Sequence, residues 1–308
     1  MINVFNLSYL PMKRLAKKLG AEFILLKQNS DFLNAMHLKL IEFENSCSAK
    51  YLLQNSINTY IQSLAKCNLR EDEYIAKMYD VEYTDIDKLE FLKNKISLDI
   101  SRFKGRCNYS FLSPLFVSDW LMRISGYSKT ELEKIKICDV GSGSGELEEY
   151  LLSLGITSTH LYSIDVSLAS IERQKRMGIN AYHGTINILP SIERFDLIFL
   201  SYFIDYDSNQ STTFTSAINH ANPGAKVILE GLLPARYMGR STQSPNNTIT
   251  RGRFAFEDVG LISKAFENLS NQVSRIAKLE RLVVGERYVY SHKGFCLLPS
   301  YFLVYKII

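Results

Sequence analysis

The sequence predicts an α/β protein in which an N-terminal α-helical domain, residues 1–130, precedes a doubly wound sheet in residues 131–308. Before Thr130, apolar residues recur at three- and four-residue steps, which is the spacing of amphipathic helices. After Lys134, short β-branched runs alternate with amphipathic helices, which is typical of βαβ units in a parallel sheet. A glycine-rich segment stands where the first such strand gives way to a helix.

Two helices are predicted in the N-terminal domain from their apolar stripes. The first stripe runs through 33–43 and the second through 86–96. No strand-like alternation of comparable length occurs before Lys134. The basic residues Lys13, Arg14, Lys17 and Lys18 are expected on a solvated helix face.

The second half of the chain contains the predicted strands 135–140, 161–165, 181–183, 196–200 and 226–230. Gly155 and Gly178 are expected to end the first two intervening helices, because glycine readily adopts the left-handed conformation found there. A turn at Pro223-Gly224 precedes the fifth strand. Residues 282–290 and 295–305 are expected to pair as an antiparallel hairpin at one edge of the sheet.

Composition excludes several classes of protein. The chain of 308 residues is 46% hydrophobic, with 17 Phe and 18 Tyr, which excludes intrinsic disorder. A net charge of +4 is too small to indicate a nucleic-acid-binding protein. The five cysteines are scattered and odd in number, which favours a reducing compartment and neither a disulfide framework nor a metal site. With no signal peptide or membrane-length apolar run, we expect a cytoplasmic protein without membrane contact.

The segment 138–146 reads Cys-Asp-Val-Gly-Ser-Gly-Ser-Gly-Glu, and its glycines allow the backbone to approach a ligand closely. Asp165 ends the next strand, where a carboxylate accepts hydrogen bonds from ribose hydroxyls. Together they predict a nucleoside-type ligand. The dinucleotide fingerprint requires glycine at position 146, where this chain has Glu146, so NAD is disfavoured. No Gly-Lys-Ser or Gly-Lys-Thr follows the glycines, so a P-loop is absent.

The pattern Asp139-x-Gly141-x-Gly143-x-Gly145 resembles the first motif of class I S-adenosylmethionine-dependent methyltransferases. This resemblance covers about residue 135 to the C-terminus and implies a seven-stranded Rossmann-like sheet with a reversed last strand. It implies S-adenosylmethionine as cofactor, with the loop at its methionine end, Asp165 at its ribose and Val166 at its adenine. Thr185 stands where family members often have an acidic residue for the adenine amine. The implied cofactor-binding residues are Asp139, Gly141, Ser142, Gly143, Gly145, Asp165, Val166, Thr185, Ile186 and Ser201.

Methyl transfer from a sulfonium needs an in-line nucleophile, so the protein mainly positions the acceptor and sometimes removes a proton. Tyr202 and Asp205 follow the fourth strand, at the sheet end where open α/β folds bind ligands, and are the predicted catalytic residues. In the long polar stretch 231–254, Arg240 and Arg251 are the predicted clamp for an anionic substrate group. The leading hypothesis is therefore O- or N-methylation of a small, anionic metabolite, with a specialised pathway as its setting.

Several alternatives remain open from the sequence. The N-terminal helices are expected to cap the cofactor pocket or to form a homodimer interface. Arg106, Tyr109 and Trp120 are candidates to close over the sulfonium, with core packing as the favoured alternative for Trp120. The aminocarboxypropyl arm is the group transferred in the first alternative, by an enzyme similar to nicotianamine synthase. The second alternative is a methyltransferase acting on RNA or protein, and the third is a non-catalytic protein that keeps the cofactor site as a sensor.

Overall fold

A computed structural model describes most of the sheet-forming part of the chain. Its described residues are 10–26, 109–110, 121–143, 145–165, 168–201, 210–232, 235–236, 250–251, 253–254, 256–291 and 294–308. The predicted helices at 33–43 and 86–96 lie outside these ranges, as do Arg106 and Trp120. The division into domains at residue 130 therefore stays a prediction.

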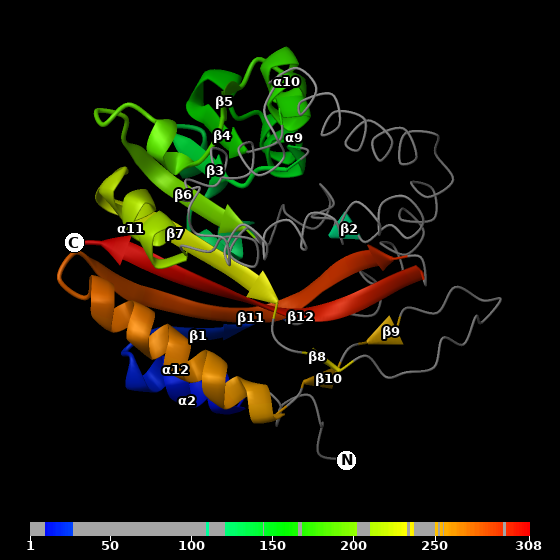
Figure 1. Cartoon of the computed structure of the whole chain (residues 1–308), viewed down its shortest axis with the longest axis vertical. Coiled ribbons are helices and arrows are strands. Elements are labelled where there is room, and N and C mark those ends of the chain that lie inside the picture. The colour runs from blue at the N-terminus through cyan, green and yellow to red at the C-terminus, as the bar shows by residue number, and fades with distance from the viewer. Residues whose placement is uncertain are drawn as a thin grey trace, which may run out of the picture.

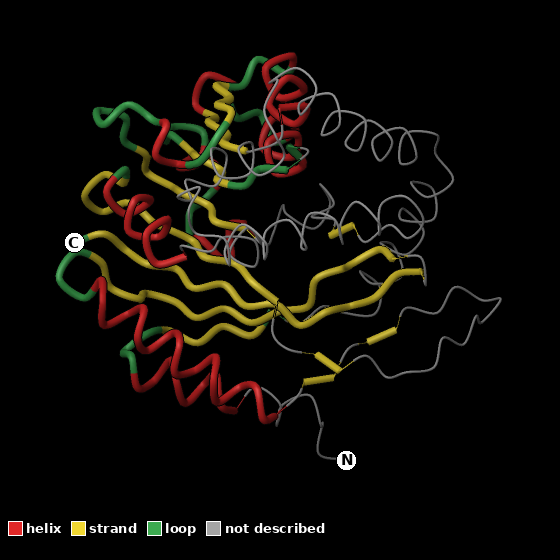
Figure 2. The backbone as a smooth tube through the Cα atoms, in the orientation of Figure 1, coloured by secondary structure: helices red, strands yellow, loops and turns green. Residues whose placement is uncertain are grey.

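One large mixed sheet organises the molecule (Figures 1 and 2). Its main path has the order β1-β11-β12-β7-β6-β3-β4-β5. The strands are β1 (Glu22–Leu25), β3 (Ile137–Val140), β4 (Leu161–Asp165), β5 (Asn180–His183), β6 (Phe195–Ser201), β7 (Ala221–Leu232), β11 (Ala277–Ser291) and β12 (Gly294–Ile307). Neighbours from β5 to β7 are parallel, whereas β12 runs antiparallel to both β7 and β11. The predicted doubly wound sheet with a reversed last strand is confirmed, but its main path has eight described strands where seven were expected, because β1 adds to the edge of β11.

The five predicted parallel strands are all present, with small differences in their bounds. β4 has its predicted range, and β7 begins earlier than predicted, at Ala221. The Pro223-Gly224 turn lies inside β7, where the pairing with β6 shifts between Phe195 and Leu197. Strand β7 therefore accommodates the turn as an irregularity, because Gly224 adopts a positive φ of 81° there.

The prediction that the terminal hairpin lies at the edge of the sheet is wrong. Strand β1 pairs in parallel with β11, from Glu22 opposite Arg281 to Leu25 opposite Val284, and covers that edge. The side chains of Glu22 and Arg281 form a salt bridge of 3.1 Å between carboxylate and guanidinium. Helix α2 (Leu10–Lys18) precedes β1 and buries Met12, Leu15 and Ala16 against the sheet, while its four basic residues are exposed as predicted.

Helices cover both faces of the sheet. Helix α9 (Glu146–Ser153), α8 (Lys129–Leu132) and the helical residues 121–125 share one apolar core with the sheet. Helices α2, α11 (Gln210–Asn219) and α12 (Phe256–Val273) share the core of the other face. Helix α10 (Leu168–Arg176) packs on β4 and β5. Gly155 and Gly178 follow α9 and α10 with φ of 92° and 79°, which confirms the predicted helix ends. Short 3-10 turns follow at Ser158–His160 (η1) and Ile186–Ile188 (η2).

Hydrogen bonds and a cation–π contact hold the segment before β3 against the amino ends of the parallel strands. The Asp196 carboxylate accepts hydrogen bonds from the Lys136 amide at 3.0 Å and from the Asn222 side chain at 2.7 Å. The Lys226 ammonium is buried, donates to the Ser125 carbonyl at 2.6 Å and lies 4.7 Å from the centre of the Tyr127 ring. Asp196 and Lys226 are therefore structural residues at the end of the sheet opposite the glycine loop.

Strands β11 and β12 continue beyond β7, whose last residue, Leu232, lies opposite Ser300. We call residues 286–291 and 294–299 of these two strands the hairpin extension. Its β11 side pairs with β2 (Tyr109–Ser110), and its β12 side pairs with β9 (Thr250–Arg251). Figure 1 shows the extension reaching past the end of β7 between these two short strands. A separate pair is formed by β8 (Ala235–Arg236) and β10 (Arg253–Phe254).

None of the helices in the described ranges is both long and apolar enough to span a membrane.

Candidate functional site

The glycine loop joins β3 to α9 at the carboxyl end of the parallel strands. Gly141, Gly143 and Gly145 have φ of 79°, 55° and 83°, a region that residues with a Cβ atom rarely adopt. The amides of Gly141 and Ser142 both donate to the Ile164 carbonyl, at 2.8 and 3.2 Å. The loop is therefore a tight turn held on the backbone of β4, and a residue with a Cβ atom would be strained at any of the three glycine positions.

The two sides of this loop differ in the space they leave. At Gly145 an added Cβ atom would lie 2.8 Å from Cγ of Gln174, so that side is closed by helix α10. At Gly143 the corresponding position has nothing within 4 Å. The loop thus presents exposed backbone at Gly143 to a ligand that approaches from the carboxyl edge of the sheet.

Asp165 is the last residue of β4, and its carboxylate reaches the loop. Oδ2 of Asp165 accepts a hydrogen bond from the Gly143 amide at 2.8 Å. Its carbonyl oxygen accepts another from the Gly184 amide at 2.9 Å, which ties the ends of β4 and β5 together. The structure brings together the two features that the sequence predicted to share one ligand.

Sequence reasoning missed Gln174, a fully buried side chain of helix α10. Its Nε2 donates to Oγ of Ser142 at 2.9 Å and to the carbonyl oxygen of Gly143 at 3.0 Å. Ile171, three residues earlier, is also fully buried, so Gln174 occupies the apolar face of α10. That spacing was the available signal, because a polar residue on an apolar helix face requires a hydrogen-bond partner.

A second buried polar pair lies beside the loop. Oγ of Ser163 in β4 donates to Oε1 of Glu148 in α9 at 2.7 Å, and both residues are buried. Burial raises the pKa of the Cys138 thiol, and the nearby carboxylates of Asp139 and Glu148 raise this pKa further. The Cys138 thiol therefore stays protonated at neutral pH and is no nucleophile.

Residues 112–256 match the family model described as "Methyltransferase domain". This segment includes β3 to β7, the glycine loop and Asp165. The part of the chain that holds the glycine loop and Asp165 therefore matches a methyltransferase domain, over just under half of the 308 residues.

Solved structures of several methyltransferases are similar in fold to this chain. They include the N-methyltransferase NodS from Bradyrhizobium japonicum WM9 in complex with S-adenosyl-L-homocysteine, at 15% identity and a TM-score of 0.40, with 71% of this chain and 98% of NodS covered. The glycopeptide N-methyltransferase MtfA, complexed with the same compound, has 13% identity and a TM-score of 0.40, with 62% and 87% covered. A proposed RNA methyltransferase from Pyrococcus horikoshii has 13% identity and a TM-score of 0.45, with 64% and 86% covered. No curated protein sequence matches the chain at a significant level.

The other predicted site residues lie in different surroundings. Asp139 is buried in β3, Thr185 is half-buried directly before η2, and Ile186 is fully buried in the core. Ser201 is the last residue of β6, and Arg251 belongs to β9. The remaining four, Val166, Tyr202, Asp205 and Arg240, lie outside the described residues. The roles assigned to all of these residues stay predictions.

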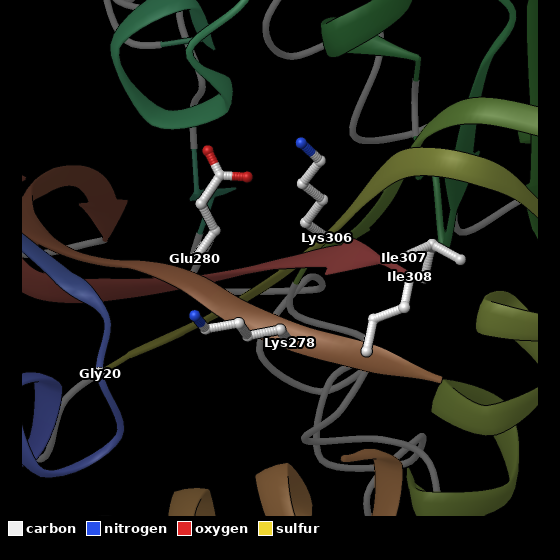
Figure 3. A pocket seen from close by; sticks show the side chains of 6 residues that line it. All are labelled: Gly20, Lys278, Glu280, Lys306, Ile307 and Ile308. Carbon is white, nitrogen blue, oxygen red and sulfur yellow. The ribbon is translucent and has the colours of Figure 1, made fainter. Parts of the chain in front are cut away.

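A hollow of about 420 Å³ lies at the other end of the methyltransferase sheet (Figure 3). It is lined by Gly20, Lys278, Glu280, Lys306, Ile307 and Ile308. Lys306 lies opposite Lys226 at the amino end of β7, whereas the glycine loop follows the carboxyl end of β3. The hollow is therefore separate from the glycine loop.

Proposed function

We propose that this methyltransferase transfers the methyl group of S-adenosylmethionine to an oxygen or nitrogen atom of a small, anionic metabolite. The observation that carries the proposal is the hydrogen bond between the Gly143 amide and Asp165. It joins a glycine loop and an acidic strand end at the carboxyl edge of a doubly wound sheet, where such folds bind nucleosides. A bound S-adenosylmethionine supplies an electrophilic methyl group on a sulfonium.

The residues around the loop fit this cofactor. The open position beside Gly143 leaves room for the methionine end to approach backbone, and the buried carboxylate of Asp139 precedes the loop. The Gly143 amide donates to Oδ2 of Asp165, and a carboxylate can accept several hydrogen bonds at once. The proposed role of Asp165 is to accept hydrogen bonds from the ribose hydroxyls as well.

The proposed acceptor side is the hairpin extension. This extension passes the carboxyl end of β7 and carries two segments that are far apart in the sequence, Tyr109–Ser110 and Thr250–Arg251. Tyr109 is in register with Tyr290, and Arg251 is in register with Leu297. An arginine at this edge supports an anionic acceptor, because the guanidinium group suits carboxylate and phosphate.

The proposed reaction needs little covalent work from the chain. The acceptor atom forms a bond to the methyl carbon as the carbon–sulfur bond breaks, and S-adenosylhomocysteine leaves. Tyr202 and Asp205 are proposed to orient the acceptor and to take its proton where it carries one. A carboxylate acceptor needs no base.

Replacement of Asp165 tests the cofactor assignment by titration calorimetry with S-adenosylhomocysteine. We expect the wild-type chain to bind, and Asp165→Ala to bind at least tenfold more weakly because its ribose acceptor is lost. Asp165→Asn is the matched control, since it keeps one oxygen for the Gly143 amide while it removes the charge and replaces the other acceptor oxygen by an NH2 donor. Absence of binding by the wild-type chain would contradict the proposal.

Product analysis separates methyl transfer from the alternatives. Incubation with S-adenosylmethionine and an acceptor panel should release S-adenosylhomocysteine, whereas transfer of the aminocarboxypropyl arm would release methylthioadenosine. Activity on an anionic small molecule should persist as the salt concentration rises. Activity on RNA alone, falling steeply with salt, would overturn the small-molecule assignment.

A further inference from the structure

We propose that Gln174 is a positioning residue for the cofactor, through the direction that it gives to the backbone of Gly143. This inference rests on the proposed function, because it concerns the affinity of the glycine loop for S-adenosylmethionine and its product. Gln174 touches neither of them and acts only through the loop.

The side-chain hydrogen bonds of Gln174 are directed at the loop. Its side chain is fully buried, and both Nε2 hydrogens are used, toward Ser142 at 2.9 Å and Gly143 at 3.0 Å. Oε1 of Gln174 also accepts from Oγ of Ser142, at 3.3 Å. A buried amide that loses these partners is left without hydrogen bonds, which costs free energy. The contacts therefore restrain the conformation of the loop.

The amide and the carbonyl of Gly143 are both hydrogen-bonded to the segment formed by β4 and α10. Its amide donates to Asp165, at the end of β4, and its carbonyl accepts from Gln174, in the helix that follows β4. The Cβ side of Gly143 is open, so no packing contact fixes its conformation from that direction. These two hydrogen bonds therefore set the orientation of the glycine backbone relative to the carboxylate proposed to bind ribose.

The consequence is a link between the two ends of the cofactor. The β4–α10 unit carries Asp165 for the ribose and, through Gln174, aims the loop at the methionine end. Loss of Gln174 would release the loop while leaving the ribose carboxylate in place. We therefore expect weaker cofactor affinity without a matching loss of the fold.

The Ser163–Glu148 pair provides a matched control. It is also a buried side-chain hydrogen bond, 2.7 Å long, and it also begins in β4. It joins helix α9 to β4, whereas the Gln174 hydrogen bonds join helix α10 to the loop. Ser163→Ala should therefore lower the thermal midpoint, as any lost buried hydrogen bond does, without altering the loop.

Titration calorimetry with S-adenosylhomocysteine, together with thermal unfolding, tests the proposal on the full chain. Gln174→Met keeps the length of the side chain and removes both donors. We expect its dissociation constant to rise about tenfold, and that of Ser163→Ala to stay within twofold, at comparable losses in midpoint. Ser142→Ala, which removes one partner of Gln174 and leaves Gly143, should give an intermediate rise.

The outcomes distinguish this inference from the proposed function. If the wild-type chain binds and Gln174→Met binds equally well, the positioning role is overturned and the cofactor site stands. If Ser163→Ala weakens binding as much as Gln174→Met does, the effect is one of general stability and the role is likewise overturned. If the wild-type chain does not bind, both proposals fail. Should Gln174→Met not fold, Ser142→Ala decides, and unchanged affinity in it refutes the role.

Discussion

Gly145 illustrates how one missing atom shapes the loop. It combines a φ of 83° with a neighbour, Cγ of Gln174, only 2.8 Å from where a Cβ atom would stand. Its amide also donates to the Ser142 carbonyl at 3.0 Å. The glycine is therefore required for two independent reasons, a backbone conformation and a close approach of helix α10.

Alanine at position 145 would be held at a positive φ, and this backbone strain alone costs about 1–3 kcal/mol. We expect Gly145→Ala to lower the free energy of unfolding by more than this amount, because the added Cβ atom also meets Gln174. Gly155→Ala is the matched control, because Gly155 has a φ of 92° and nothing within 4 Å of its Cβ position. Urea unfolding of both variants measures the difference. Equal losses would show that the contact with Gln174 adds nothing to the strain of the backbone.

At this scale the sequence predicted residues with a local signature and missed those without one. The spacing of Gly141, Gly143 and Gly145 and the position of Asp165 after a strand are readable along the chain. Gln174 acquires its importance only when α10 folds over the loop. Its neighbours in α10 are charged and resemble an ordinary solvated helix face. The sequence around Gln174 therefore gives little sign that its amide is buried.

Among the elements, the sequence predicted those with long or bounded patterns. The strands β11 and β12 were readable because their β-branched and aromatic runs are long, and α9 and α10 because glycines end them. Strand β1 has only four residues, too few to display alternation, and its pairing with β11 depends on residues far along the chain. Its place in the sheet is decided by tertiary contacts.

We expect Arg251→Ala to raise the apparent KM for an anionic acceptor about tenfold, because a charge-assisted hydrogen bond beside the hairpin extension is lost. Affinity for S-adenosylhomocysteine should not change, since β9 pairs with β12 and not with the strands of the glycine loop. Steady-state kinetics with an acceptor from the panel measures the effect. Arg253→Ala, in the separate pair of β8 and β10, is the control. An equal effect of both variants would argue against a specific clamp at Arg251.

For the whole molecule, the buried Tyr305 and the half-buried Tyr127 connect stability with pH. Burial raises the pKa of Tyr305 to about 12, although its hydrogen bond with Ser270 lowers it in part. Burial and the negative charge of Asp196 raise the pKa of Tyr127 to about 12 as well. Both phenols ionise near pH 10 when the chain unfolds, so the folded state holds its protons to higher pH.

The sign of the effect follows from these directions. Below pH 10 both states keep the phenol protons and stability is fully present. Between about pH 10 and 12 the unfolded chain loses them first, so the free energy of unfolding should fall as pH rises. Denaturant unfolding across this window measures the fall. Tyr305→Phe should flatten it, and an unchanged slope in that variant would contradict the assignment.

Strand β1 also has a consequence for how the protein is made. Its partner segment in β11 lies about 260 positions further along the chain, so a nascent polypeptide carries β1 unpaired until β11 has left the ribosome. The sheet can be completed only after β11 and β12 have been synthesised. Premature termination upstream of β11 would thus leave β1 unpaired and prone to aggregation, and would not give a shorter folded protein.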